Sequence, residues 1–409
     1  MPQDGVVVVG GGIAGVSTVA ALRAGGYAGA ITLVEKATRP YDRPPLSKEY
    51  LAGASDLTQI ALQPAEWYAE QRIDLIGDAV ATALRPRLGE VELADGRLLV
   101  ADRIVLATGG RPVRPPIPGG DSPRVHVLRE ASDADRLREL LLPGARLLIV
   151  GAGLIGAEVA STARDRGADV VLVDPLDPPL AAAVGRDVAR WLHGLHADHG
   201  VETVTTTLEA LQETATGIGA QLVGEPDSRE FDAVLLGVGM TPDTGLAHAG
   251  GLATDRGILV DERQVTSAPN VLAVGDCSRL RDHRRTEHWE AAQHDGARAA
   301  ATILGAEPPK PTAPWFWSDR YHLHVEGVGE MREPDAETQV VVRGTLGEPP
   351  FSVFTVRVST GSTTGRVVGA VAVDDSNAVR AARRLIDRGV AVEPADLAEG
   401  DLRQLLRGR

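Results

Sequence analysis

At 409 residues the chain is too long for one ordinary hydrophobic core, so two or three domains are expected. A hydrophobic content of 43% and a charged content of 24% are typical of soluble globular proteins, and glycines interrupt the most apolar stretch, residues 6–22, too often for a membrane span. The formal net charge of −14 argues against a nucleic-acid-binding surface, because phosphate recognition needs local positive charge.

The beginning of the chain predicts a strand, a glycine-rich turn and a helix. β-branched residues at 6–9 lead into Gly10-Gly11-Gly12-Ile13-Ala14-Gly15, and a second strand ends at Glu35, 20 residues after the last of these glycines. In G-x-G-x-x-G the first glycine makes the turn, the second lets a pyrophosphate approach the backbone, and the third lets the helix pack on the strand. The helix N-terminus attracts phosphate and the acid accepts from ribose hydroxyls, so this segment predicts a dinucleotide site.

Several short elements are expected between this motif and a proline-rich linker at residues 112–123. Asp95-Gly96 is a hairpin turn signal between two of them. In chain order they are a proline-bearing loop at 39–46, a helix near 65–71, short strands at 90–93 and 97–100, and a buried strand at 104–110 that ends in glycines.

A second motif of the same kind occurs about a domain later. Residues 147–150 lead into Gly151-Ala152-Gly153-Leu154-Ile155-Gly156, and the following strand ends at Asp174, 18 residues after the last glycine. One such motif alone is weak support, but two in the same strand–turn–helix–strand context predict two dinucleotides held by one chain. Asp174 favours NADH over NADPH, because a carboxylate repels a 2′-phosphate. Glu158, just after the third glycine, has no counterpart in the first motif.

The rest of the chain predicts the return of the first domain and then a new one. The apolar strands at 233–236 and 271–274 each end in glycines, and prolines between 308 and 314 mark a further junction. The expected fold class is therefore α/β, with two Rossmann-like dinucleotide-binding domains, one inserted in the other, and a C-terminal α+β domain. The expected boundaries are 1–112 with 238–314, 113–237, and 315–409; the last part contains strands at 339–343 and 366–373 and a helix at 378–388.

A family resemblance is visible in the loop 41–48, in the segments 107–111 and 271–276, and in Pro314-Trp315-Phe316-Trp317-Ser318-Asp319. With these motifs the chain resembles the NADH:ferredoxin reductases of cytochrome P450 and Rieske oxygenase systems, the putidaredoxin- and rubredoxin-reductase type, over most of its length. The resemblance implies FAD on the first glycine motif, NADH on the second, and a C-terminal domain that covers the flavin. It also implies a [2Fe-2S] or related small ferredoxin as the partner.

The resemblance implies site residues position by position. Lys48 matches a lysine beside the flavin N5, Glu158 an acid near the nicotinamide, and Trp317 an aromatic next to the flavin, so these three are the expected catalytic residues. The expected FAD contacts are Gly10, Gly12, Ile13, Ala14, Gly15, Glu35, Lys36, Arg43, Lys48, Val80, Ala107, Thr108, Gly109, Arg129, Gly275, Asp276, Glu287, Trp289 and Trp317. The expected NADH contacts are Gly151, Gly153, Leu154, Ile155, Gly156, Glu158, Asp174 and Gly239.

The sequence departs from the family pattern at three places. Trp289 replaces a smaller residue, Arg320 stands where a glutamine is usual, and residues 374–376 replace a more basic turn that contains proline. The last two changes affect the surface expected to meet the partner, so they leave its identity open.

Structural roles remain as alternatives for the main candidates. Lys48 is also compatible with a solvated lysine after a proline turn, Asp276 with a helix N-cap, and Trp317 with core packing. Glu158 is also compatible with a first-turn acid that complements the helix dipole. The spacing of His193, His196 and His199 allows a metal site, but no other ligand motif joins them, so a solvated helix and no metal are expected.

The cysteine content restricts the reaction. Disulfide reductases of this fold need a redox cysteine pair, and their peroxidase and coenzyme A disulfide reductase relatives need one cysteine in the loop 37–46. This chain has one cysteine, Cys277, outside that loop, so core packing is its expected role and electrons are expected to pass from the flavin straight to an acceptor. The single cysteine also fits a reducing compartment, and the chain start lacks a basic signal-peptide region, so a cytoplasmic location is expected.

An acidic chain needs a local positive surface to bind an acidic ferredoxin. The arginines within 279–285 and 380–388 are the candidates for docking, although either cluster alone is also compatible with ordinary solvated surface. A monomer and a homodimer both remain open. Two other functions remain open too: an NADH oxidase or quinone reductase, and an interaction protein whose assembly responds to flavin reduction.

Overall fold

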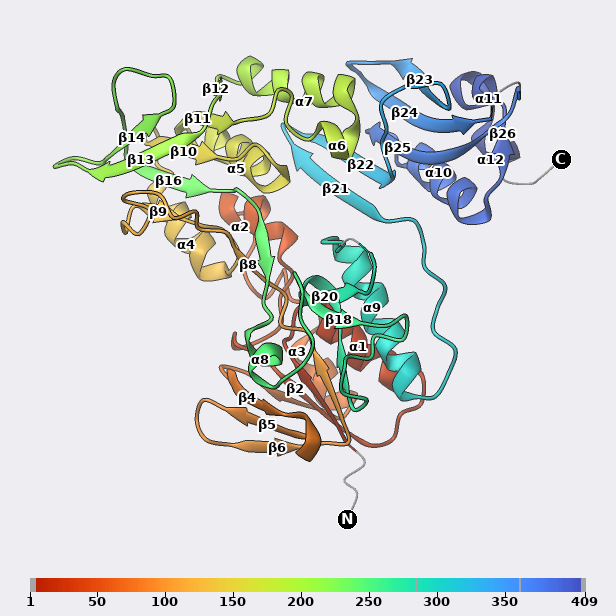
Figure 1. The fold of residues 1–409 in the computed structure, drawn as a ribbon. Coiled ribbons are helices and arrows are strands. Elements are labelled where there is room, and N and C mark those ends of the chain that lie inside the picture. The colour runs from red at the N-terminus through yellow and green to blue at the C-terminus, as the bar shows by residue number, and fades with distance from the viewer. Residues whose placement is uncertain (1–4, 284, 360–361, 406–409) are drawn as a thin grey trace. The chain divides into compact units, whose positions relative to one another are not determined.

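The computed structural model describes residues 5–283, 285–359 and 362–405 (Figure 1). The chain divides into two compact units. The first unit is Met1–Pro45, Ser55–Arg111 and Met240–Pro311; the second is Leu46–Ala54, Pro112–Gly239 and Thr312–Arg409. The three-domain division stays a prediction, and the second unit contains both the segment around the second glycine motif and the C-terminal segment.

The first unit is built on a five-stranded parallel sheet of order β19-β7-β1-β2-β3. Helices α1 and α9 pack side by side against one face, where Val6 and Val8 of β1 join their apolar core (Figure 1). Gly296 permits this close approach, because a Cβ there would lie 2.6 Å from the carbonyl oxygen of Ala14. The bounds are β1 (Gly5–Val9), β2 (Ala30–Val34), β3 (Ile73–Ile76), β7 (Arg103–Leu106), β19 (Val271–Ala273), α1 (Ile13–Ala24), α3 (Ala65–Glu70) and α9 (Trp289–Ile303).

The other face of this sheet is covered by a small antiparallel sheet and helix α8. Val7 and Val9 of β1 point to that side, as the two-residue period of a strand requires, and they pack with residues of β4, β5 and α8. The bounds are β4 (Ala81–Arg85), β5 (Glu90–Leu93), β6 (Leu98–Val100), β8 (Gly110–Pro112), β17 (Met240–Pro242), α8 (Gly245–Ala249), β18 (Ile258–Val260) and β20 (Ser278–Leu280).

The second unit repeats the plan with a five-stranded parallel sheet of order β12-β11-β10-β16-β9. A three-stranded antiparallel sheet packs on one face of it through an apolar core. The bounds are β9 (Val125–His126), α4 (Ala131–Leu140), β10 (Arg146–Val150), α5 (Leu154–Asp165), β11 (Asp169–Asp174), β12 (Glu202–Thr205), β13 (Leu208–Glu213), β14 (Ile218–Leu222), β15 (Arg229–Phe231) and β16 (Ala233–Leu236).

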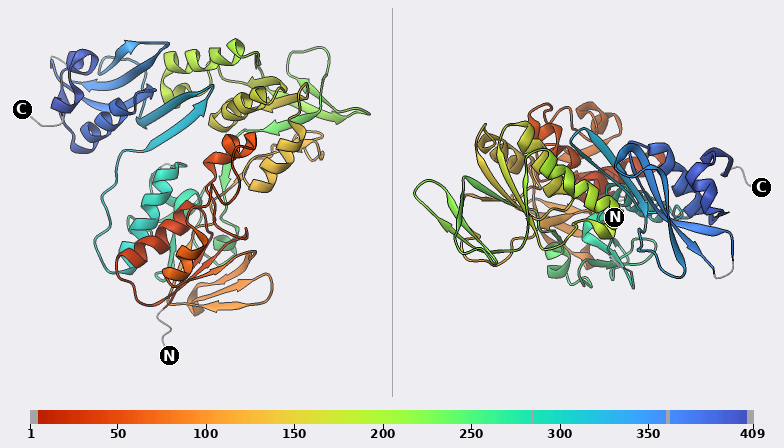
Figure 2. Two further views of the ribbon diagram at one scale, coloured as in Figure 1. Left: turned by 180° about the vertical axis from the view of Figure 1, so that it is seen from behind. Right: turned by 90° about the horizontal axis from the view of Figure 1, so that it is seen from above.

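A six-stranded antiparallel sheet forms the C-terminal part of the same unit. Helices α10–α12 cover one face, and α6 and α7 share an apolar core with the other (Figure 2). The C-terminal sheet is therefore packed against helices that follow the second glycine motif. The bounds are α2 (Glu49–Ala52), α6 (Ala181–Val184), α7 (Arg186–Asp198), β21 (Trp315–Arg320), β22 (Leu323–Gly329), β23 (Thr338–Thr345), β24 (Glu348–Val358), β25 (Gly365–Val373), α10 (Ser376–Arg388), β26 (Ala391–Val392), α11 (Pro394–Glu399) and α12 (Leu402–Leu405).

The predicted α/β class, with two Rossmann-like units and a C-terminal α+β region, is confirmed. Within the described residues, no helix has the length and apolar character needed to cross a bilayer.

Candidate active site

The first glycine motif forms a tight turn between β1 and α1. Gly10 has a φ of +108°, and a Cβ at Gly15 would lie 1.9 Å from the Gly10 carbonyl oxygen, so both positions require glycine. Gly12 caps α1 in extended conformation. The Arg43 guanidinium lies beside this turn, with its Nη1 2.9 Å from where a Gly12 Cβ would be.

The second motif repeats this geometry between β10 and α5. Gly151 has a φ of +101°, and a Cβ at Gly156 would lie 1.9 Å from the Gly151 carbonyl oxygen. Gly153 caps α5 at a φ of −66°, and a Cβ there would meet no atom within 4 Å among the described residues. The surface in front of Gly153 is therefore open to a ligand.

The acids at the ends of β2 and β11 bind the glycine turns. Glu35 accepts from the backbone N–H of Gly11 at 2.5 Å, and Asp174 accepts from that of Ala152 at 2.8 Å. Each carboxylate also accepts from the N–H two residues further along the chain, at Ala37 and Leu176 respectively. The two acids thus stabilise their turns, and each oxygen keeps a lone pair for a ribose hydroxyl.

Both turns fit a dinucleotide. In the described chain no side chain caps the first N–H groups of α1 or α5, so these donors and the positive end of each helix dipole are available to a pyrophosphate. Gly153 leaves the backbone uncovered where that phosphate would approach, and at Gly12 the cationic Arg43 guanidinium lies at the corresponding place. FAD and NADH, the cofactors predicted for these motifs, match this donor arrangement.

Other predicted flavin residues gather around the first sheet. Thr108 donates to the carbonyl oxygen of Asp243 at 2.6 Å, and Gly109 and Gly275 have positive φ at the ends of β7 and β19. The Trp289 indole donates to Asp42 at 2.8 Å and so links α9 to the loop after β2. The remaining first-unit candidates are Ile13 and Ala14 on α1, the exposed Lys36, Val80, the buried Ala107, Asp276, and Glu287, which pairs with Arg285.

One acid near Gly275, Asp295, carries no sequence motif. Asp295 on α9 accepts from the backbone N–H of Gly275 at 3.2 Å and from the amide of Gln264 at 3.0 Å. Burial raises the pKa of Asp295 to about 6. Sequence reasoning missed Asp295 because a lone acid on a helix carries no motif.

The three other predicted flavin residues, Lys48, Arg129 and Trp317, belong to the second unit. The short segment 46–54 is fixed there by several contacts: Thr162 of α5 donates to the carbonyl oxygen of Ser47 at 2.8 Å, and Tyr50 donates to Asp135 of α4 at 3.0 Å. Arg129 precedes α4, and its backbone N–H donates to Asp133. Lys48 is therefore held by the helix of the second glycine motif.

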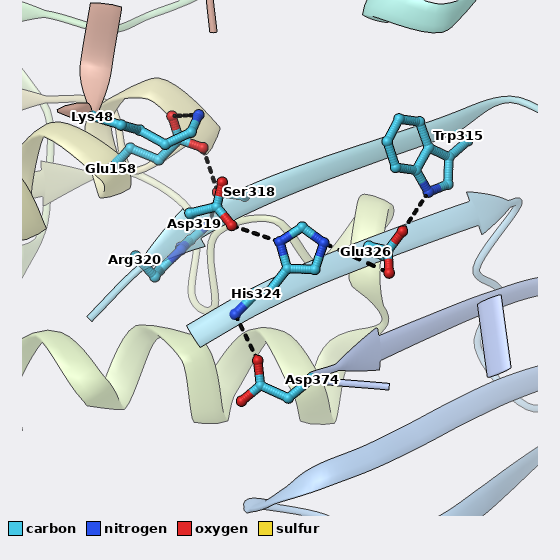
Figure 3. Close-up of polar contacts among 9 residues, drawn as sticks. All are labelled: Lys48, Glu158, Trp315, Ser318, Asp319, Arg320, His324, Glu326 and Asp374. Atoms are coloured by element: carbon cyan, nitrogen blue, oxygen red, sulfur yellow. Dashed lines mark hydrogen bonds and ion pairs between the residues drawn. The ribbon is translucent and has the colours of Figure 1, made fainter. Parts of the chain in front are cut away.

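Glu158 is the centre of a buried polar cluster (Figure 3). It is 4% exposed and pairs with the ammonium group of Lys48 at 3.0 Å. The hydroxyl of Ser47 donates to the same carboxylate oxygen at 2.5 Å, and the hydroxyl of Ser318 donates to the other at 2.7 Å. Arg320 is buried and donates to Ser318 at 3.0 Å, so the expectation that this position alters the partner surface is wrong. Glu158 is the fifth residue of α5, so the alternative of a first-turn acid is wrong.

The two faces of β21 have different neighbours. Ser318 and Arg320 face the Glu158 cluster, and Trp315 and Trp317 stack on each other with ring centroids 5.0 Å apart. The Lys48 ammonium lies 6.0 Å from the Trp317 ring. Next to the tryptophans, His324 pairs with Asp319 at 2.6 Å and its other nitrogen lies 3.6 Å from Glu326, which accepts from the Trp315 indole (Figure 3).

Sequence reasoning gave no site role to Ser47 and Ser318 and noted Arg320 only as a departure from the family. Serines carry no charge and occur in most loops and strands, so no pattern separates these two from the rest. Arg320 could have been found from one feature of the sequence: it alternates with Ser318 and Phe316 on one face of a strand. A cation on a buried face is rarely without a partner, which would have indicated an acid nearby.

The histidine prediction is wrong for one residue. His196 is 1% exposed and its Nδ1 lies 2.6 Å from the Tyr321 hydroxyl, so this side of α7 is packed rather than solvated. Burial lowers the pKa of His196 to about 3. His199 stacks on Tyr321, which places the histidines in a packing cluster between α7 and the C-terminal sheet.

Cys277 is buried, and its thiol lies within hydrogen-bond distance of the carbonyl oxygens of Leu106 and Val274. Burial raises the pKa of the Cys277 thiol. It is thus a core residue, as predicted.

Comparison with known proteins identifies the family. A family model described as pyridine nucleotide-disulphide oxidoreductase matches residues 4–296, and one described as reductase C-terminal matches residues 315–406. The chain is 38% identical to putidaredoxin reductase of Pseudomonas putida over 86% of both proteins. It is 36% identical to the ferredoxin–NAD(+) reductase subunit of the benzene 1,2-dioxygenase system of Pseudomonas putida, over 98% of this chain and 97% of that protein.

A solved structure shows the same relationship. The crystal structure of the covalent putidaredoxin reductase–putidaredoxin complex matches with a TM-score of 0.90 and 34% identity, covering 100% of this chain and 99% of that one. The resemblance predicted from the sequence is confirmed. The chain belongs to the pyridine nucleotide-disulphide oxidoreductase family, in the group with a reductase C-terminal domain that includes the ferredoxin–NAD(+) reductases.

Proposed function

We propose that this chain is an FAD-containing reductase that takes hydride from NADH and passes electrons singly to an iron–sulfur ferredoxin of a cytochrome P450 or Rieske oxygenase system. The observation that carries the proposal is the pair of equivalent glycine turns, each with an acid bound to it, in a chain whose one cysteine is buried. Bound FAD supplies the conversion between two-electron and one-electron transfer.

The protein supplies binding and electrostatics. The turn at Gly10 would hold the FAD pyrophosphate and the turn at Gly151 would hold that of NADH, each through backbone N–H groups. With FAD bound, Lys48 would stabilise the negative charge of the reduced flavin, and Glu158 fixes the position of the Lys48 ammonium through a 3.0 Å ion pair. The Trp317 ring, 6.0 Å from the Lys48 ammonium, would exclude water on that side.

Cys277 takes no part in the transfer. It has no cysteine partner in the sequence and is fully buried, so no dithiol relay can form within the chain. With no cysteine relay in the chain, electrons would pass from bound flavin directly to the acceptor.

The function is tested by stopped-flow mixing of the oxidised holoenzyme with NADH and then with candidate ferredoxins. We expect NADH to bleach the flavin, and to do so at least tenfold more efficiently than NADPH, because Asp174 repels a 2′-phosphate. Reduced enzyme should then reduce a [2Fe-2S] ferredoxin faster than it reduces oxygen or quinone. Absence of bleaching contradicts the proposal, and faster turnover with oxygen or quinone favours an oxidase. Slow bleaching with an NADH-dependent change of oligomeric state favours a sensor.

Ferredoxin docking through local arginines is part of the proposal, and we favour the cluster on α10. Arg279 and Arg285 each form an ion pair, with Asp255 and Glu287 respectively. On α10, Arg380 and Arg384 are exposed and four residues apart, so they lie on one face of the helix. The α10 arginines therefore suit an acidic ferredoxin better.

The double variant Arg380→Glu, Arg384→Glu is expected to raise the KM for ferredoxin about tenfold and to weaken its dependence on salt, because surface charge acts mainly on association. The KM for ferredoxin, measured in steady state at low and at high ionic strength, checks both expectations. Flavin reduction by NADH is the control and should not change. Wild-type rates that do not respond to salt contradict arginine docking.

A cytoplasmic location, in keeping with the buried free thiol of Cys277, is proposed on composition alone.

A further inference from the structure

Arg320 is a buried cation at the end of β21. Its side chain is 3% exposed, and its Nη2 donates to the Ser318 hydroxyl oxygen at 3.0 Å. Its Nε has no hydrogen-bond partner in the described parts of the chain. Burial lowers the pKa of Arg320 and the Glu158 carboxylate opposes that change, so the guanidinium remains charged beside the carboxylate.

The direction of the hydrogen bonds follows from the chemistry of arginine. A guanidinium has only donors, so the Ser318 oxygen must accept from Arg320. The single Ser318 proton is then left for Glu158, whose second carboxylate oxygen lies 2.7 Å away. Arg320 therefore orients Ser318 as a donor to Glu158.

This orientation completes the set of donors around Glu158. Ser47 and Lys48 occupy one carboxylate oxygen, at 2.5 and 3.0 Å, and Ser318 occupies the other. A carboxylate held at both oxygens cannot rotate away from the lysine without breaking a hydrogen bond. Because the cluster is buried, each of those bonds costs more to lose than it would in water.

A glutamine at position 320, which the family resemblance implies as the usual residue, would not have this effect. Its amide contains an acceptor as well as a donor, so Ser318 could turn its proton to the glutamine instead of Glu158. It is also uncharged, so it adds no attraction to the carboxylate. Arginine at position 320 therefore directs the Ser318 proton to Glu158, whereas glutamine would not.

We propose that Arg320 is a positioning residue for hydride transfer: it fixes Ser318 as a donor to Glu158 and thereby holds the Glu158 carboxylate against the Lys48 ammonium. The inference rests on the proposed function, in which Lys48 stabilises charge during flavin reduction by NADH.

A double-mutant cycle tests the inference. The variants are Arg320→Gln, Ser318→Ala and the double variant, and the measurement is the limiting rate of flavin reduction in stopped flow, with the NADH concentration dependence. Each single variant is expected to lower the limiting rate about tenfold while the Kd for NADH changes less than twofold. The double variant should be no slower than either single one, because Arg320 acts through Ser318. Arg320→Lys, which keeps a charged donor, should retain most of the rate.

Arg343→Gln is the matched control. The Arg343 guanidinium donates to the carbonyl oxygens of Leu397, Ala398 and Gly400 and so joins β23 to the end of α11, outside the Glu158 cluster. Its replacement should lower the Tm and leave flavin reduction unchanged. If Arg320→Gln does not fold, Arg320→Lys at near wild-type rate and Ser318→Ala at a tenfold lower rate provide the same test.

The outcomes separate the proposed function from the role of Arg320. A wild-type flavin that NADH does not reduce contradicts the proposed function. A wild-type flavin that is reduced rapidly, with an Arg320→Gln variant at the same rate, overturns only the role of Arg320. The role of Arg320 is also overturned if the fold losses of rate in Arg320→Gln and Ser318→Ala multiply in the double variant, because the two residues then act independently.

Discussion

Replacement of Lys48 by methionine is expected to slow flavin reduction by NADH about 100-fold, the usual effect of removing one electrostatic stabiliser from a buried site. The methionine fills a similar volume but cannot balance the charge that hydride transfer brings. Stopped-flow reduction of the holoenzyme at saturating NADH measures the effect. Because the change removes a stabilising charge rather than a binding contact, the Kd for NADH should change much less than the rate.

The same substitution has a structural cost that must be separated from the catalytic one. Glu158 is buried, and without Lys48 the hydroxyls of Ser47 and Ser318 are the side-chain donors left to its carboxylate among the described residues. Loss of one partner of a buried ion pair commonly destabilises a protein by about 3–5 kcal/mol. The double variant Lys48→Met, Glu158→Gln removes both charges and should recover most of the Tm but none of the rate.

Lys310→Met is the matched control, since Lys310 is an exposed lysine outside the site. It should leave both Tm and rate unchanged. A Lys48→Met enzyme that is reduced as fast as wild type, or a double variant that recovers the rate along with the stability, contradicts the catalytic role of Lys48.

The glycine motifs show how far sequence reasoning extends. The spacing of Gly10, Gly15 and Glu35 predicts a local structure that depends on the backbone at the two glycines and on one carboxylate, and the structure meets each requirement. A Cβ at Gly15 would clash with the Gly10 carbonyl oxygen, and Glu35 binds the turn. Motifs of this kind can be found in sequence because the constraint is short-range.

The Glu158 cluster shows where sequence reasoning ends. Its members come from the segment after the first motif, from α5, and from β21, with Ser47, Glu158 and Ser318 more than 100 residues apart in the chain. Lys48 and Glu158 were predicted through the family resemblance, whereas the two serines were not, because hydrogen-bond partners chosen by tertiary packing leave no periodic pattern. The same applies to His196, whose hydrogen-bond partner Tyr321 lies 125 residues away in the chain.

Replacement of Gly153 by alanine is expected to raise the KM for NADH at least tenfold without affecting folding. The φ of −66° is allowed for alanine, and a Cβ would meet no atom of the described chain within 4 Å. The new methyl group therefore has no protein neighbour to disturb. Its effect falls on the approach of the NADH pyrophosphate to the turn, which is the step that the second glycine of the motif permits.

Gly194→Ala is the control that makes this result specific. Gly194 lies in α7, and a Cβ there also meets nothing within 4 Å in the described chain. In the absence of NADH, each substitution therefore adds a methyl group that contacts no described protein atom. Gly194→Ala should raise stability by up to about 1 kcal/mol, the gain for alanine over glycine inside a helix, and leave the KM for NADH unchanged. Gly156→Ala, whose Cβ would lie 1.9 Å from the Gly151 carbonyl oxygen, should instead lose NADH binding together with stability. A Gly153→Ala enzyme with wild-type KM and Tm means that no pyrophosphate passes close to this turn, and NADH must then bind elsewhere in the chain.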